Sequence, residues 1–176
     1  MAQQYFVLGI GGTGMRCIES LIHLCAMGMF DDTDIHLLAL DTDKDNGNFA
    51  RLKEVKEAYV KAKGTDASLR TALNETFFSA NINYYEFSPN YEVKSDFMSV
   101  FNYGDTKFNN PEQTAIADLV LTKNVETFNL RHGYRAQTHL GSMMMYHSIL
   151  EAARSNKNSE LKTYLQKLIQ VAQNGG

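Results

Sequence analysis

The stretch FVLGIGGTGMRC, residues 6–17, constrains the fold more than any other part of the chain. An apolar run leads into four glycines within six residues, and a helical pattern follows at once. Glycine is favoured where the backbone turns tightly or approaches another group closely. A strand, a glycine turn and a helix in this order begin a βαβ unit, which predicts a parallel sheet covered by helices.

The first forty residues continue this alternation. Residues 4–9 and 35–40 are apolar runs typical of buried strands, and residues 14–28 between them carry apolar side chains at helical spacing. We expect the two strands to be adjacent and parallel, with the helix packed against them, because crossovers of this kind are right-handed and return to the same sheet.

The remaining sequence predicts mostly helices. We expect a strand at 82–87 and helical segments at 51–63 (solvated and ended by Gly64), 67–78, 95–102, from Pro111 onward, 142–154 and from an N-cap at Ser159 onward. In the last helix the expected apolar stripe is Leu161, Leu165, Leu168 and Ala172, and Met143, Met144 and Met145 are expected to fill the core. The whole chain, 1–176, is predicted to form one α/β nucleotide-binding domain with a Rossmann-like parallel sheet and flanking helices.

Composition and charge argue against several classes of protein. A net charge of -3 and a pI near 5.9 argue against general binding to nucleic acid or anionic membranes. The sequence has neither an apolar run of membrane-spanning length nor a signal peptide, so the cytoplasm is the expected compartment. Cys17 and Cys25 would lie about 12 Å apart on a helix, too far for a disulfide, and are expected to be buried free thiols. No metal site is expected from the histidine and cysteine spacing.

The glycine turn is the first candidate binding site. Gly9, Gly11 and Gly14 satisfy G-x-G-x-x-G in the context of a strand followed by a helix. Bare backbone N–H groups at a helix start attract a phosphate, which favours nucleotide binding. The alternative is a tight turn in which the glycines serve packing alone. No Gly-Lys-Ser/Thr follows, so the motif is not a P-loop.

Two later segments are candidates for the same site. LDTDKDN follows the second strand, where Asp41 or Asp43 could hold a ribose, or could simply be a solvated loop acid. GYRAQTHLGS, from Gly133 to a helix expected to start at Gly141 or Ser142, is either a second phosphate-binding loop or an ordinary surface loop. We expect this third loop to fold back against the glycine turn.

Together the three segments resemble the N-terminal nucleotide-binding portion of the tubulin/FtsZ superfamily, closest to its bacterial tubulin-like members. GIGGTGMRC is similar to the family's first glycine loop, LDTDKDN to its Asn-Thr-Asp loop, and GYRAQTHLG has the length of its third loop. Residues 5–46 and 131–150 carry the resemblance. The family's fourth loop, G-G-T-G-[ST]-G, is absent, so we expect the chain to be the N-terminal part of a longer protein.

The resemblance implies a guanine nucleotide, GTP or GDP, with Mg²⁺ as a further expectation. The phosphate-binding residues that it implies, with the helix residues beside them, are Gly9, Gly11, Gly12, Thr13, Gly14, Met15 and Arg16. It places Asp41, Thr42 and Asp43 in the second loop, and Arg135, Ala136, Gln137 and Thr138 towards the γ-phosphate. GTP hydrolysis, self-assembly or a protein partner would belong to the longer chain, and no hydrolytic residue is identified here.

Two other functions remain open at this point. A NAD-binding Rossmann domain of an oxidoreductase would use Gly9, Gly11, Gly14 and Asp41, but would leave the third loop unexplained. An adenylating domain of the ubiquitin-activating type has a similar glycine loop and Asp-x-Asp strand end. The chain lacks the CxxC pair expected for an adenylating domain of this type.

Overall fold

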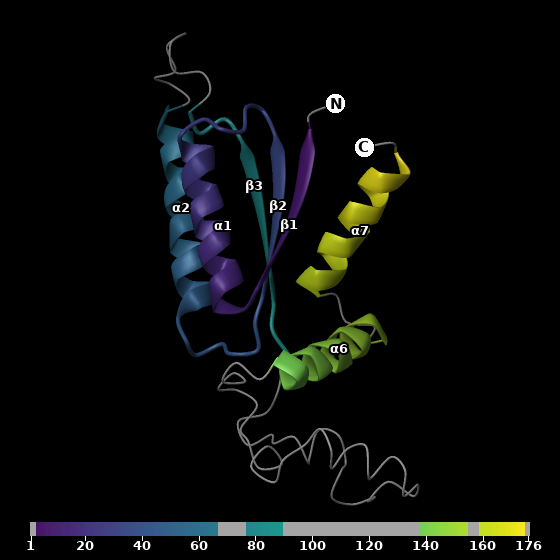
Figure 1. The fold of residues 1–176 in the computed structure, drawn as a ribbon. Coiled ribbons are helices and arrows are strands. Elements are labelled where there is room, and N and C mark those ends of the chain that lie inside the picture. The colour runs from purple at the N-terminus through teal and green to yellow at the C-terminus, as the bar shows by residue number, and fades with distance from the viewer. Residues whose placement is uncertain (1–2, 67–76, 90–137, 155–158, 175–176) are drawn as a thin grey trace, which may run out of the picture.

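The computed structural model describes residues 3–66, 77–89, 138–154 and 159–174 (Figure 1). In chain order the described elements are β1 (Gln4–Ile10), α1 (Gly11–Ala26), β2 (Asp34–Leu40), α2 (Asn48–Asp66), β3 (Asn81–Phe87), α6 (Thr138–Arg154) and α7 (Glu160–Gln173). The strands predicted at 4–9, 35–40 and 82–87 are therefore confirmed, each to within about a residue.

The three strands form a parallel sheet in the order β1-β2-β3. Gln4 pairs with Asp34 at one end, and Ile10 pairs with Leu40, which pairs with Phe87, at the other. The predicted adjacency and parallel direction of the first two strands are confirmed. Because all three strands run the same way, their carboxyl ends meet at one edge, and the turns into α1 and α2 both leave from that edge.

Helices cover both faces of the sheet, and this burial explains the apolar strand sequences. Helices α1 and α2 lie on one face and α7 lies on the other (Figure 1). The core on the α1 face is built from α1, β2 and α2, with Met15, Ile18, Ile22, Cys25, Ile35, Leu37, Ala39, Leu52 and Tyr59 buried. The core on the α7 face contains Leu38, Leu40, Phe87, Leu161 and Tyr164. Strand β2 is thus buried on both sides, as expected for a central parallel strand.

One titratable side chain, His36, lies inside the layer between the sheet and α7. It is buried and stacks between Phe6 and Tyr85. Burial lowers the pKa of His36 below 6.5; the charge of Asp34 opposes this shift and that of Lys167 adds to it. The neutral imidazole is therefore the form that suits this apolar layer.

Two helices differ from their predicted extents. Helix α1 begins at Gly11 rather than residue 14, because the chain enters the helix directly from the last paired residue of β1. Helix α2 spans Asn48–Asp66, so it continues through Gly64 instead of ending there. The charged side of this helix is exposed or partly exposed, as predicted for a solvated helix, but Leu52 and Tyr59 on its other side are buried against α1 and the sheet.

The two C-terminal helices also differ in part from their predictions. Helix α6 begins at Thr138, earlier than the predicted Gly141 or Ser142. The N-cap at Ser159 is confirmed, since its hydroxyl oxygen accepts a hydrogen bond from the backbone N–H of Lys162. Of the apolar stripe predicted for α7, only Leu161 is buried, and the other three members are exposed. The helix contacts β2 and β3 and buries Tyr164 instead, because Tyr164 packs edge-on against Phe6 and Tyr85 of the sheet.

The predictions for single side chains had mixed outcomes. Met144 is buried and Met145 packs, partly buried, against the core on the α7 face, whereas Met143 is exposed, so the prediction of core methionines holds for two of the three. Cys25 is buried and Cys17 is exposed, which contradicts the prediction of two buried thiols. Within the described ranges no helix is long and apolar enough to cross a membrane. The helices predicted at 95–102 and after Pro111, and most of that at 67–78, lie outside the described residues.

Candidate phosphate-binding site

The glycine turn joins β1 to α1 with no room for side chains at two positions. A Cβ on Gly14 would lie 2.7 Å from the carbonyl carbon of Gly9, and one on Gly9 would lie 2.9 Å from the carbonyl oxygen of Gly14. Gly11 between them has φ +67, a left-handed conformation that glycine adopts readily. These three glycines therefore let the first turn of α1 lie directly against the end of β1.

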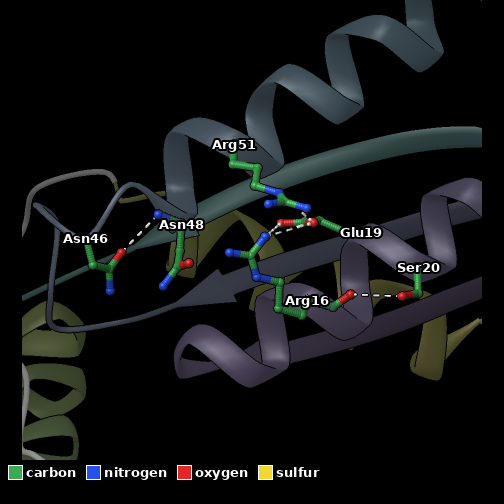
Figure 2. Close-up of polar contacts among 6 residues, drawn as sticks. All are labelled: Arg16, Glu19, Ser20, Asn46, Asn48 and Arg51. Carbon is green, nitrogen blue, oxygen red and sulfur yellow. Dashed lines mark hydrogen bonds and ion pairs between the residues drawn. The ribbon is translucent and has the colours of Figure 1, made fainter.

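Gly12 brings the start of α2 to the same place. A Cβ on Gly12 would lie 2.9 Å from Nδ2 of Asn48, the first residue of α2. Asn48 is itself oriented by its chain neighbour, because its backbone N–H donates to Oδ1 of Asn46 at 2.9 Å (Figure 2). The first turns of α1 and α2 are consequently neighbours at the carboxyl edge of the sheet.

The start of α1 has no side-chain cap. Its N-cap residue is Ile10, which has no hydrogen-bond acceptor in its side chain, and no acidic residue lies in the first helical turn. The first N–H groups of a helix have no partner within the helix, and Ser, Thr, Asp or Asn usually caps them. Helix α7 follows that rule through Ser159. The donors of α1 instead form a patch of positive potential without a side-chain acceptor from Ile10.

The second loop leaves the sheet next to the glycine turn, because Leu40 pairs with Ile10. Asp41 follows Leu40 and is buried. Its Oδ1 accepts from the backbone N–H of Asp43 at 3.1 Å, and its Oδ2 accepts from Nδ2 of Asn46 at 3.2 Å. Both oxygens of Asp41 thus hold the shape of its own loop, whereas Asp43 is partly exposed.

A buried carboxylate about two turns into α1, on Glu19, links this helix to the first turn of α2. Glu19 accepts from Nη1 of Arg16 at 3.1 and 3.2 Å and from Nε of Arg51 at 3.0 Å (Figure 2). The side chain of Glu19 is 7 % exposed, while those of Arg16 and Arg51 are 48 % and 59 % exposed. Arg16, a candidate from the sequence, is therefore part of an ion-pair cluster between two helices.

The structure places the sequence candidates as follows. Gly9, Gly11, Gly12, Thr13 and Gly14 lie in the glycine turn, with Thr13 exposed, and the turn adjoins the loop formed by Asp41, Thr42 and Asp43. Met15 is buried in the core and faces away from solvent, so its contribution is packing. Thr138 lies at the first position of α6 rather than in a loop. Arg135, Ala136 and Gln137 lie outside the described residues, so the expected approach of the third loop to the glycine turn stays a prediction.

Sequence reasoning missed four residues that shape this region: Glu19, Asn46, Asn48 and Arg51. One signal was available for Glu19, because it lies next to Ile18 and four residues after Met15, on the apolar side of α1. A carboxylate at such a position needs a basic partner. The identity of Arg51 as a partner depends on how α2 packs, which no local pattern gives.

The described part of the chain contains no group of three or more His, Cys, Asp or Glu side chains placed to hold a metal ion. Comparisons of the chain with protein-family models, with curated proteins and with solved structures found no match.

Proposed function

We propose that this chain is a nucleotide-binding domain that holds phosphate groups at the start of α1. The observation that carries the proposal is the helix start itself: a glycine turn with no side-chain cap, opening at the carboxyl edge of a parallel sheet. Ligands of open parallel sheets bind outside this edge, and phosphates suit uncapped helix starts. The first N–H donors of α1, which Ile10 does not cap, and the helix dipole would offset part of the lost hydration of the phosphate.

The resemblance to the tubulin/FtsZ superfamily makes a guanine nucleotide, GTP or GDP, the proposed ligand. In this proposal Gly11, Gly12, Thr13 and Gly14 bind the phosphates, and the Asp41–Asp43 loop lines the site. The segment from Arg135 to Thr138 lies towards the terminal phosphate. Mg²⁺ would be held mainly through the phosphates, since the described residues offer no cluster of ligands for it. Assembly, hydrolysis and a cytoplasmic location are further parts of the same proposal.

The NAD alternative receives less support from the second loop. A dinucleotide-binding domain needs a carboxylate at the end of the second strand that is available to the ribose hydroxyls. Each oxygen of Asp41 already accepts a hydrogen bond from within the 41–46 loop. Reorienting Asp41 towards a ribose would release the donors on Asp43 and Asn46, so this geometry favours a structural role for Asp41.

The test is nucleotide binding by a variant that repels phosphate without disturbing the fold. Thr13 is exposed in the first turn of α1, so Thr13→Glu introduces no buried charge. An acidic side chain there stabilises the helix by about 0.3–1 kcal/mol through the dipole, while repelling a bound phosphate. We expect Thr13→Glu to melt at or slightly above the wild-type temperature and to lose GTP binding measured by isothermal titration calorimetry.

The matched control is Thr163→Glu, which adds the same charge at an exposed position near the start of α7. It should bind GTP as the wild type does. Titration of the wild type with GTP, ATP and NAD compares the proposed base with its alternatives. Absence of binding of every nucleotide by the wild-type protein would refute the proposal, and preferential binding of NAD would replace it by the dinucleotide alternative.

A further inference from the structure

The cluster of Arg16, Glu19 and Arg51 has more positive charge than its structure requires. One carboxylate neutralises one guanidinium, so two arginines on Glu19 leave a net charge of about +1. Arg16 alone already gives Glu19 a partner within α1, three residues away. The second arginine, from α2, therefore adds a charge that the burial of Glu19 does not explain.

Both guanidinium groups keep donors for another acceptor. A guanidinium has five N–H groups. Glu19 is contacted by Nη1 of Arg16 and by Nε of Arg51, and within the described residues neither side chain has a further hydrogen bond. About half of each side chain is exposed, so an anion in solution can approach the remaining donors. Glu19 holds one nitrogen of each guanidinium, which lowers the entropy cost of presenting the remaining N–H groups.

The cluster lies beside the glycine turn. Gly12 and Asn48 are neighbours at the starts of α1 and α2, and Arg16 and Arg51 are each about one helical turn further along. Figure 2 shows Arg16 of α1 and Arg51 of α2 meeting Glu19 between the two helices, about one turn beyond Asn48 at the start of α2.

We propose that Arg16 and Arg51, held by Glu19, bind a second phosphate group beyond the one at the start of α1. The site would then select a polyphosphate, such as a nucleoside di- or triphosphate, over a monophosphate. This inference rests on the proposed function, because it places the first phosphate at the glycine turn. Guanidinium groups bind phosphate through paired hydrogen bonds, which gives such a contact both charge and direction.

Arg51→Gln is the informative variant because it leaves the pairing of Arg16 with Glu19 intact. The control is Lys53→Gln, which removes the same charge from an exposed position of α2 two residues away, about 200° around the helix. Arg51→Lys keeps the charge but not the fork of donors. The probes for calorimetric titration are inorganic orthophosphate, inorganic tripolyphosphate, GMP and GTP, so that the result is independent of base recognition.

We expect Arg51→Gln to bind tripolyphosphate and GTP about 10- to 100-fold more weakly than Lys53→Gln does, as for a lost charged hydrogen bond. Binding of orthophosphate and GMP should change equally little in both variants, and Arg51→Lys should recover part of the loss. A thermal melt of each variant without ligand separates these effects from a change in folding.

Two results would overturn the inference in distinguishable ways. In the first result, the wild type binds tripolyphosphate or GTP, but Arg51→Gln either binds them as tightly as Lys53→Gln does or loses the same factor of affinity for monophosphates and polyphosphates. The arginines then do not bind a second phosphate, and the proposed function stands. If the wild type binds none of the four probes, the proposed function fails and the second phosphate position fails with it.

Discussion

Replacing Gly14 by alanine tests whether the glycine turn is required for packing independently of any ligand. The new Cβ would lie 2.7 Å from the carbonyl carbon and 2.9 Å from Cα of Gly9, and backbone atoms cannot move aside as a flexible side chain can. Overpacking of this kind costs about 1–3 kcal/mol. Alanine recovers about 1 kcal/mol through its higher helix propensity. The difference between the two effects lowers the free energy of unfolding of Gly14→Ala by up to about 2 kcal/mol.

The assay is urea denaturation of the protein without nucleotide, followed by circular dichroism. Gly64→Ala is the control, since Gly64 also lies in a helix and its Cβ would meet no atom within 4 Å. That variant should gain about 0.5–1 kcal/mol from helix propensity alone. If Gly14→Ala is as stable as Gly64→Ala, the close approach of α1 to β1 imposes no cost, and the expected effect of Gly14 on packing is refuted.

Three further predictions follow from single positions. Ile10→Ser should raise the free energy of unfolding by about 1 kcal/mol, because serine can cap α1 and because Ile10, 62 % exposed, contributes little burial that would be lost. The same variant should bind GTP more weakly in a titration. Burial lowers the pKa of His36, so below about pH 6.5 the unfolded chain binds more protons than the folded protein does. The free energy of unfolding of the wild type, measured by urea denaturation, should therefore fall more between pH 7.5 and pH 5.5 than that of His36→Phe. An equal fall in both proteins would contradict this prediction. Burial raises the pKa of the Cys25 thiol to about 11, so a maleimide at pH 7.5 should label Cys17 alone, as peptide mass spectrometry would show.

The strands and their order could be predicted because their signals are local. Strand β2 is apolar apart from Asp34 and His36 and is buried over six of its seven residues. A mostly apolar strand between two helical segments is typical of the middle of a parallel sheet. Helix α2 was predicted only in part, for the opposite reason. Its many charges concealed a narrow apolar stripe that includes Leu52 and Tyr59, whose burial depends on contact with α1.

Cys17 and Cys25 show that a modest angle around the axis of α1 separates a buried position from an exposed one. Eight residues correspond to just over two helical turns, which leaves about 80° between the directions of Cys17 and Cys25. Cys25 shares the buried side of α1 with Ile18 and Ile22, and Cys17 lies outside it. Approximate periodicity therefore identified the helix but could not assign both thiols. The pairing of Arg51 with Glu19 could not be predicted from the sequence, because it depends on how α1 and α2 pack together.

The glycine motif is weaker support for a bound nucleotide than Ile10, the residue at the N-cap of α1. Gly9 and Gly14 are needed for the contact between strand and helix, and Gly11 for its positive φ. A Cβ on Gly12 would meet only the side-chain end of Asn48, which can move. Packing thus accounts for three of the four glycines without a ligand. Packing does not account for Ile10 at the N-cap, where an isoleucine leaves the first donors of α1 without a side-chain acceptor and a serine would stabilise the helix. Departures from local preference of this kind are expected at functional sites, so the inference of a bound phosphate depends on the absent cap more than on the glycine motif.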